Sequence, residues 1–73
     1  MNTKKKIKLS KRELVVLELL KAGMKNREIA KEIEVNEKTV STYILRVRKK
    51  LNVDKKYNVY YLVSKALELE LIN

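Results

Sequence analysis

Apolar residues recur along the chain at the spacing that places them on one face of a helix. Between residues 14 and 20 nearly every position is apolar, and Gly23 follows, where a glycine can take the left-handed conformation that ends a helix. Ser10 and Glu13 have the spacing of a capping box, which satisfies two amides at a helix start. We therefore predict a first helix over about 11–22.

Two further helices are predicted on either side of a short polar link. The first runs from Asn26, which can cap it, to about Glu34, with one apolar face made by Ile29, Ala30 and Ile33. After Asn36, another cap, a longer helix is predicted over about 37–51. Its apolar stripe consists of Val40, Tyr43, Ile44, Val47 and Leu51.

A fourth helix is predicted from about Lys55 to Leu71, capped by Asp54 and lengthened at its end by nearly a turn. It has two apolar faces. One suits a core and consists of Val59, Leu62, Val63 and Ala66. The other consists of Tyr57, Tyr60, Tyr61, Ser64, Leu67 and Leu71. A small domain cannot cover both faces, so we expect the second face to form a homodimer contact, although ordinary core and boundary positions are an alternative.

Composition agrees with an all-α fold. The chain has 73 residues, one glycine and no proline, which suits a single small helical domain and leaves tight β-hairpins without their turn residues. We expect a basic arm at 1–8 and a helical domain at 9–73. The arm is either a solubilising tail or a contact to nucleic acid.

Charge points to an anionic partner. Lysine and arginine number 18 and aspartate and glutamate 9, so the formal net charge is +9. A polyanion such as nucleic acid is the expected partner of so basic a domain. The most cationic stretch puts six cations into eleven residues against one acid: Arg46, Arg48, Lys49, Lys50, Lys55 and Lys56, with Asp54.

Enzymatic chemistry is not expected. The chain has no cysteine and no histidine, which excludes disulfides, thiolate or imidazole metal sites and nucleophiles activated by histidine. The carboxylates are spread along predicted helices beside lysines, as in surface ion pairs: Glu13, Glu18, Glu28, Glu32 and Glu37. We expect no catalytic residue, metal or cofactor. The basic start is followed by polar residues and there is no long apolar run, so we expect a cytoplasmic protein without a membrane segment.

The second and third helices, joined by the link 34–36, form the arrangement of a helix-turn-helix. The polar side of the third helix carries Lys38, Ser41, Thr42, Leu45 and Lys49, with Arg46 and Arg48 on its flanks. A B-DNA major groove, about 12 Å wide, admits one such helix. The alternative is an ordinary solvated surface helix, but the uncompensated cations favour an external anion.

Five segments of the chain resemble the LuxR/GerE-type DNA-binding domain, also found in NarL/FixJ response regulators. They are residues 9–14 (LSKREL), 16–20 (VLELL), 23–30 (GMKNREIA), 35–40 (VNEKTV) and 49–53 (KKLNV). The resemblance covers about 9–72. It implies a four-helix transcription regulator without a catalytic activity or cofactor, in which the fourth helix can mediate dimerisation. Such domains are usually attached to a sensor domain, and we expect a free-standing regulator here.

The resemblance also implies residue roles. Lys38 and Thr39 fall where family members hold phosphates, and with Lys49 and Lys50 they are predicted to hold the DNA backbone. The predicted base-facing residues are Ser41, Thr42, Leu45 and Arg46.

Three departures from the family pattern carry expectations of their own. Leu45 replaces a polar or basic residue, and it contacts a thymine methyl, lies on sugar or is simply exposed. Arg48 stands at an aliphatic position, so its stem is expected to cover the core edge while its guanidinium reaches solvent or phosphate. Glu34 takes a turn position that is frequently glycine, and a positive φ there would cost about 1 kcal/mol.

Two other functions remain open. A protein-interaction module would use the exposed apolar residues to bind RNA polymerase or a separate regulator. A structured-RNA-binding protein would use the same positive charge. The leading hypothesis is a homodimeric regulator that binds double-stranded DNA sequence-specifically.

Overall fold

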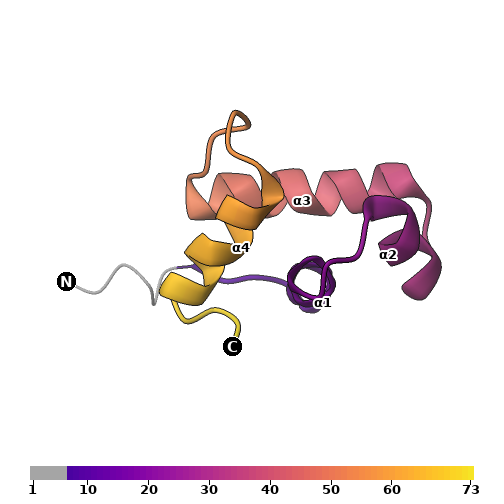
Figure 1. The fold of residues 1–73 in the computed structure, drawn as a ribbon, viewed down its shortest axis with the longest axis horizontal. Coiled ribbons are helices and arrows are strands. Elements are labelled where there is room, and N and C mark those ends of the chain that lie inside the picture. The colour runs from indigo at the N-terminus through magenta and orange to yellow at the C-terminus, as the bar shows by residue number, and fades with distance from the viewer. Residues whose placement is uncertain (1–6) are drawn as a thin grey trace.

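The computed structural model describes residues 7–73, which form four α-helices and no strand. They are α1 (Lys11–Lys21), α2 (Asn26–Glu32), α3 (Glu37–Leu51) and α4 (Val59–Glu68) (Figure 1). The predicted all-α, four-helix fold is confirmed. The predicted basic arm, 1–8, lies outside the described residues except for Ile7 and Lys8. Ile7 is half-buried and packs against the core.

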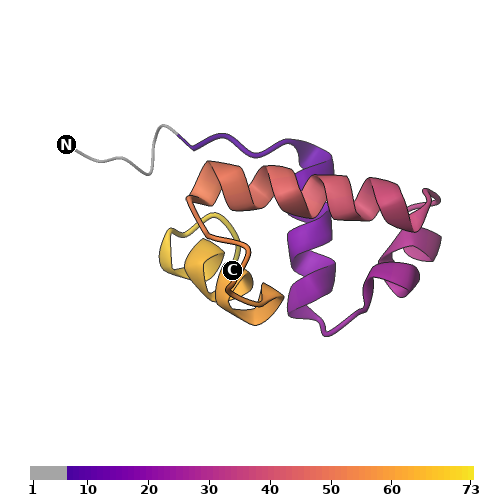
Figure 2. The ribbon, with the colours of Figure 1, turned by 90° about the horizontal axis from the view of Figure 1, so that it is seen from above.

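The first helix lies at the centre of the fold. α1 contacts each of the other three helices, and α3 also packs against α2 and α4. Figure 2 shows α1 running crosswise beneath α3, with α2 and α4 on opposite sides of α1. Because α1 and α4 both lie below α3 in Figure 1, the opposite side of α3 has no described helix packed over it.

The predicted apolar stripes form the core. The fully or almost fully buried residues of α3 and α4 are Val40, Ile44, Val47, Leu51, Leu62, Val63 and Ala66. From α1 they meet Val16, Leu17 and Leu20, and from α2 Ile29 and Ala30. Tyr43 and Val59 are half-buried against the same core. The helical spacing therefore predicted the core faces of α2, α3 and α4, whereas for α1 it gave only a nearly continuous apolar run.

Two of the four predicted helix caps are confirmed. The Ser10 hydroxyl accepts from the Glu13 amide at 3.1 Å, and the Glu13 carboxylate accepts from the Ser10 amide at 2.9 Å. The Asn36 side chain accepts from the third amide of α3 at 2.8 Å. The cap predicted at Asn26 is wrong by one residue. Lys25 precedes α2, and the Glu28 carboxylate accepts from the Lys25 amide at 2.8 Å.

The predicted start of the fourth helix is wrong by four residues. α4 begins at Val59 because the side chain of Asn58 accepts from its third amide, at 3.0 Å. Asp54 caps a turn instead, since its carboxylate accepts from the Lys56 amide two residues later at 3.0 Å. Tyr57 therefore lies in the loop before the helix and not on its second face.

All four helices end with the same motif. A residue with positive φ follows the last turn, with values of 92° at Gly23, 60° at Glu34, 58° at Asn52 and 61° at Glu70. The next amide donates five residues back, from Met24, Val35, Val53 and Leu71, at 2.9–3.1 Å. These four apolar side chains then pack on the core. Glu34 therefore bears the strain that a positive φ imposes on a residue other than glycine. The predicted extension of α4 to Leu71 is wrong because Glu70 turns the chain.

A buried carboxylate joins the start of α1 to the end of α3. Glu13 is only 3% exposed, and its Oε1 accepts from Lys50 Nζ at 2.8 Å as well as from the Ser10 amide. Lys50 also donates to the Lys8 carbonyl at 2.9 Å. The expectation that Glu13 belongs to the surface carboxylates is therefore wrong. Burial raises the pKa of the Glu13 carboxyl, but the hydrogen bonds from Lys50 and Ser10 outweigh it, so the pKa lies below its ordinary value.

Replacing Glu34 by glycine should stabilise the domain, because glycine adopts a φ of 60° without the Cβ strain that glutamate bears. We expect a gain of about 1 kcal/mol, or a thermal midpoint about 4–8 °C higher. Glu34→Ala is the matched control, since it removes the carboxylate and keeps the Cβ. An equal gain in both variants would show that the charge, and not the backbone, causes the effect.

The lowered pKa of Glu13 predicts how stability depends on pH. The ion pair contributes fully above the ordinary glutamate pKa of about 4.3 and is lost as pH falls through the lower folded-state value. Glu13→Gln should cost about 1–3 kcal/mol at neutral pH and flatten the acid limb of stability against pH, measured by urea unfolding. Glu18→Gln, at an exposed site on α1, is the control. If the free energy of unfolding falls equally steeply at acid pH in Glu13→Gln and in the unchanged chain, the pKa of Glu13 is not lowered by folding.

Candidate nucleic-acid interface

α2 and α3 are held as a helix-turn-helix by contacts on both sides of the turn 33–36. Arg12 of α1 donates from Nη1 to the Ile33 carbonyl at 3.2 Å, which supports the end of α2. Asn36 caps α3 on the other side of the turn. Their positions are set by the shared core, so the two helices form one rigid unit with α1 behind them.

The outer side of α3 carries six of the predicted DNA-contacting residues, and all six are exposed. They are Lys38, Ser41, Thr42, Leu45, Arg46 and Lys49. They lie opposite the buried residues of α3, so the polar side that the sequence predicts for this helix is exposed. A helix with its side chains is about 10–12 Å across, close to the width of the major groove.

Hydrogen bonds within the domain determine which of the three hydroxyl groups on α3 can still donate or accept a hydrogen bond. The Ser41 hydroxyl lies 3.5 Å from the side-chain amide of Asn26, which donates to it, so its own proton stays available. Thr42 donates its proton to the Lys38 carbonyl at 3.0 Å and keeps lone pairs to accept with. Thr39 is half-buried and donates its hydroxyl proton to Asn36 at 2.9 Å, so its hydroxyl is not an available donor to phosphate.

The cations at the end of α3 divide into two groups. Arg48 and Lys50 are used inside the domain: the Arg48 Nη1 donates to the carbonyls of Asp54, at 3.1 Å, and Tyr57, at 2.8 Å. Its Nε and Nη2 make no hydrogen bond within residues 7–73, so the expected reach of the guanidinium to solvent or phosphate stays a prediction. Lys50 is held by Glu13, so this geometry does not favour its predicted phosphate contact. Arg46 and Lys49 make no hydrogen bond or ion pair within residues 7–73 and point outward.

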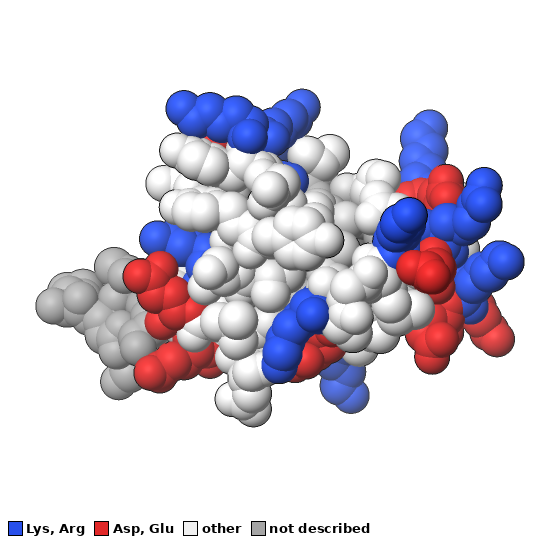
Figure 3. Space-filling view, viewed as in Figure 1, with Lys and Arg blue, Asp and Glu red and all other residues white. Residues whose placement is uncertain are grey.

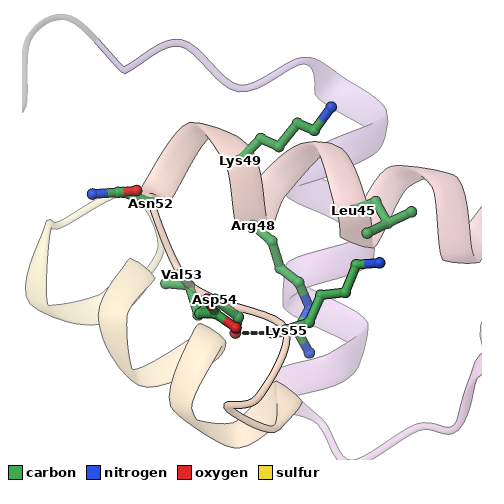
Figure 4. A pocket seen from close by; sticks show the side chains of 7 residues that line it. All are labelled: Leu45, Arg48, Lys49, Asn52, Val53, Asp54 and Lys55. Atoms are coloured by element: carbon green, nitrogen blue, oxygen red, sulfur yellow. Dashed lines mark hydrogen bonds between the residues drawn. The ribbon is translucent and has the colours of Figure 1, made fainter.

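Beside the outer side of α3 lies an open cleft of about 370 Å³. It is lined by Leu45, Arg48, Lys49, Asn52, Val53, Asp54 and Lys55 (Figure 4). Leu45 is 43% exposed, which agrees with a contact surface but does not by itself distinguish a thymine methyl from a sugar.

Positive charge is unevenly distributed over the face shown in Figure 3. Lysine and arginine gather over the loop between α3 and α4, at the top of the view, with little acidic surface beside them. At the end occupied by α2, cations alternate with acids. There the Arg27–Glu37 pair is long, at 3.8 Å, and exposed, so it contributes little to stability.

The residues predicted for dimerisation do not form one helix face. Tyr60, Tyr61, Ser64 and Leu67 lie on α4 and are exposed, with Tyr60 71% exposed. Tyr57, in the loop, stacks on Tyr61 with ring centroids 4.5 Å apart, and Lys56 Nζ lies 5.4 Å from the Tyr57 ring. Leu71 follows the helix and is half-buried against the core. The exposed aromatic surface therefore consists of the Tyr57–Tyr61 stack and of Tyr60, which lines a hollow beside the turn between α1 and α2.

Other kinds of site find no support in the described residues. Residues 7–73 contain no group of three acidic, histidine or cysteine side chains placed to hold a metal ion. None of their helices has the length and apolar character needed to cross a bilayer.

Comparison with known proteins identifies the fold family. The pattern of the luxR family of bacterial regulatory proteins matches residues 7–63. BvgA of Bordetella pertussis, whose name describes a transcription regulator of virulence factors, is 54% identical over 44 residues, covering 60% of this chain and 21% of BvgA. The oxygen regulatory protein NreC of Staphylococcus carnosus is 40% identical over 65 residues, covering 89% of this chain and 29% of NreC. No solved structure gives a significant match.

The chain thus spans less than a third of the length of these relatives. The match covers α1, α2, α3 and the first part of α4, which together hold the exposed side of α3 in place. The chain belongs to the luxR family of bacterial regulatory proteins, with a LuxR-type helix-turn-helix of the kind that binds DNA in transcription regulation.

Proposed function

We propose that this protein binds double-stranded DNA sequence-specifically as a homodimer and regulates transcription, with α3 inserted in the major groove. The observation that carries the proposal is the free outer side of α3, where polar and cationic residues are exposed opposite a buried apolar stripe. Family membership supports DNA binding. The groove, the bases contacted and the dimer belong to the proposal, and the resemblance to the LuxR/GerE-type domain and the exposed side of α3 support them.

The available hydrogen-bonding groups suggest which residues contact bases and which contact phosphates. Ser41 can donate to a base acceptor, Thr42 can accept from a base amino group, and Arg46 can bind guanine with two hydrogen bonds. Lys38 and Lys49, at the two ends of the face, suit phosphates. Lys50 and Thr39 are left out of this set, because their polar groups are bonded within the domain.

The exposed tyrosines on and before α4 support the homodimer. Tyr57, Tyr60, Tyr61 and Leu67 are each at least 40% exposed, and aromatic side chains supply large contact areas with few rotatable bonds. Each copy of α3 in the dimer would then bind one of two half-sites on the DNA.

A protein-interaction module is the second candidate, and the exposed apolar residues outside α4 favour it. Val15 on α1 is 40% exposed, and Leu45 is similarly open. Such a module would bind RNA polymerase or a separate regulator, and its affinity would change little between low and physiological salt. Duplex DNA binding requires a strong salt dependence, so one titration separates the two candidates.

Single substitutions on α3 should separate base contacts from phosphate contacts. After selection of binding sites from random duplex DNA, Arg46→Ala should relax preference at one position by about 1–3 kcal/mol. Lys49→Ala should weaken binding to all DNA sequences equally, and it should reduce the slope of log affinity against log salt concentration by about 0.9. Lys21→Ala, which removes one charge from exposed α1 surface, is the control. An unchanged salt slope in Lys49→Ala would show that α3 is not oriented as proposed.

Sedimentation equilibrium tests the homodimer separately. The unchanged chain should have the mass of two copies at high concentration, and Tyr60→Lys should have the mass of one, because a charge at this 71% exposed site opposes apolar association without disturbing the core. Val15→Lys makes the same change on α1 and should remain dimeric. Equal masses for Tyr60→Lys and the unchanged chain would show that Tyr60 does not lie in a dimer interface.

A further inference from the structure

The cleft beside α3 has two walls that come from different elements. Leu45 and Lys49 form the wall on α3, and Asp54 and Lys55 form the wall on the following loop, with Val53 between them. In Figure 4 the side chains of Lys49 and Lys55 extend on either side of Leu45. The cleft is therefore continuous with the outer side of α3 but extends beyond the helix-turn-helix itself.

The rim of this cleft has positive charge that the domain does not neutralise. Lys49 and Lys55 are exposed and make no hydrogen bond or ion pair within the described residues. The one acid in the lining is Asp54, and its carboxylate accepts from the Lys56 amide. An apolar surface at Leu45 between two free ammonium groups matches a ligand that is apolar and anionic in alternation, as the deoxyribose and phosphate of DNA are.

We propose that the cleft holds the sugar–phosphate backbone of one DNA strand, with a phosphate between Lys49 and Lys55 and a deoxyribose against Leu45. This inference rests on the proposed function and extends it. Leu45 contacts sugar and not a thymine methyl, because its exposed side chain faces the cleft between the two lysines. The loop between α3 and α4 becomes part of the DNA interface.

Arg48 is the positioning residue of this site. Its Nη1 donates to the Asp54 and Tyr57 carbonyls, which lie on either side of Lys55 in the chain. The hydrogen bond to Asp54 is drawn in Figure 4. These two bonds hold the loop against α3, and so they keep Lys55 across from Lys49. Arg48 acts here through the loop, because both hydrogen bonds that its side chain makes within the described residues are to loop carbonyls.

Lys55→Ala tests the phosphate contact. With a mixed-sequence duplex as the probe, the slope of log affinity against log salt should fall by about 0.9, as one phosphate contact is lost, while sequence preference is unchanged. Lys21→Ala should keep the full slope. If Lys49→Ala lowers the slope and Lys55→Ala behaves like Lys21→Ala, the cleft inference is overturned and the proposed function stands. If neither lysine of the cleft changes the slope, the proposed function fails with it.

Arg48→Met tests the positioning role, because methionine keeps an unbranched apolar stem and removes the hydrogen bonds to the loop. In this background Lys55→Ala should change the salt slope no further, whereas Lys49→Ala should still lower it by about 0.9. A general loss of structure would weaken both effects alike. Full additivity of Arg48→Met and Lys55→Ala would show that Arg48 does not position Lys55.

Discussion

The burial of four residues of α3 determines which way its polar side faces. Val40, Ile44, Val47 and Leu51 are each at most 7% exposed, and burying such a side chain contributes about 1.5–3 kcal/mol. A rotation of the helix about its axis would expose several of them at once, at a cost comparable to the stability of a small domain. The intervening residues must therefore face outward, and the helix-turn-helix presents them with α1 as a fixed support.

Positive charge has two different uses in this domain. Arg48 and Lys50, on the inner edges of α3, donate to groups of the same chain and join α3 to the next loop and to the start of α1. Lys49, between them in sequence, faces outward, because adjacent helical positions point about 100° apart. All three residues contribute equally to the net charge of +9, but Arg48 and Lys50 already donate hydrogen bonds within the chain, whereas Lys49 makes none within the described residues.

Local signals predicted the helices well where one signal dominated, as with the Ser10 capping box and Gly23. The start of α4 was mispredicted because Asp54 and Asn58 are both suitable caps, and a contact from Arg48 on another helix holds the loop between them. Helical spacing predicted the exposed side of α3. It could not predict the Glu13–Lys50 pair, whose partners are 37 residues apart, or which hydroxyl protons are already used.

We propose that duplex DNA binds to the outer side of α3, and amide chemical shifts measured by NMR can locate the binding surface residue by residue. Addition of a duplex should shift the amides of Ser41, Thr42 and Leu45 most strongly and leave those of the buried stripe on α1 nearly unchanged. Shifts that are confined to the tyrosines of α4, with α3 unaffected, would contradict the account.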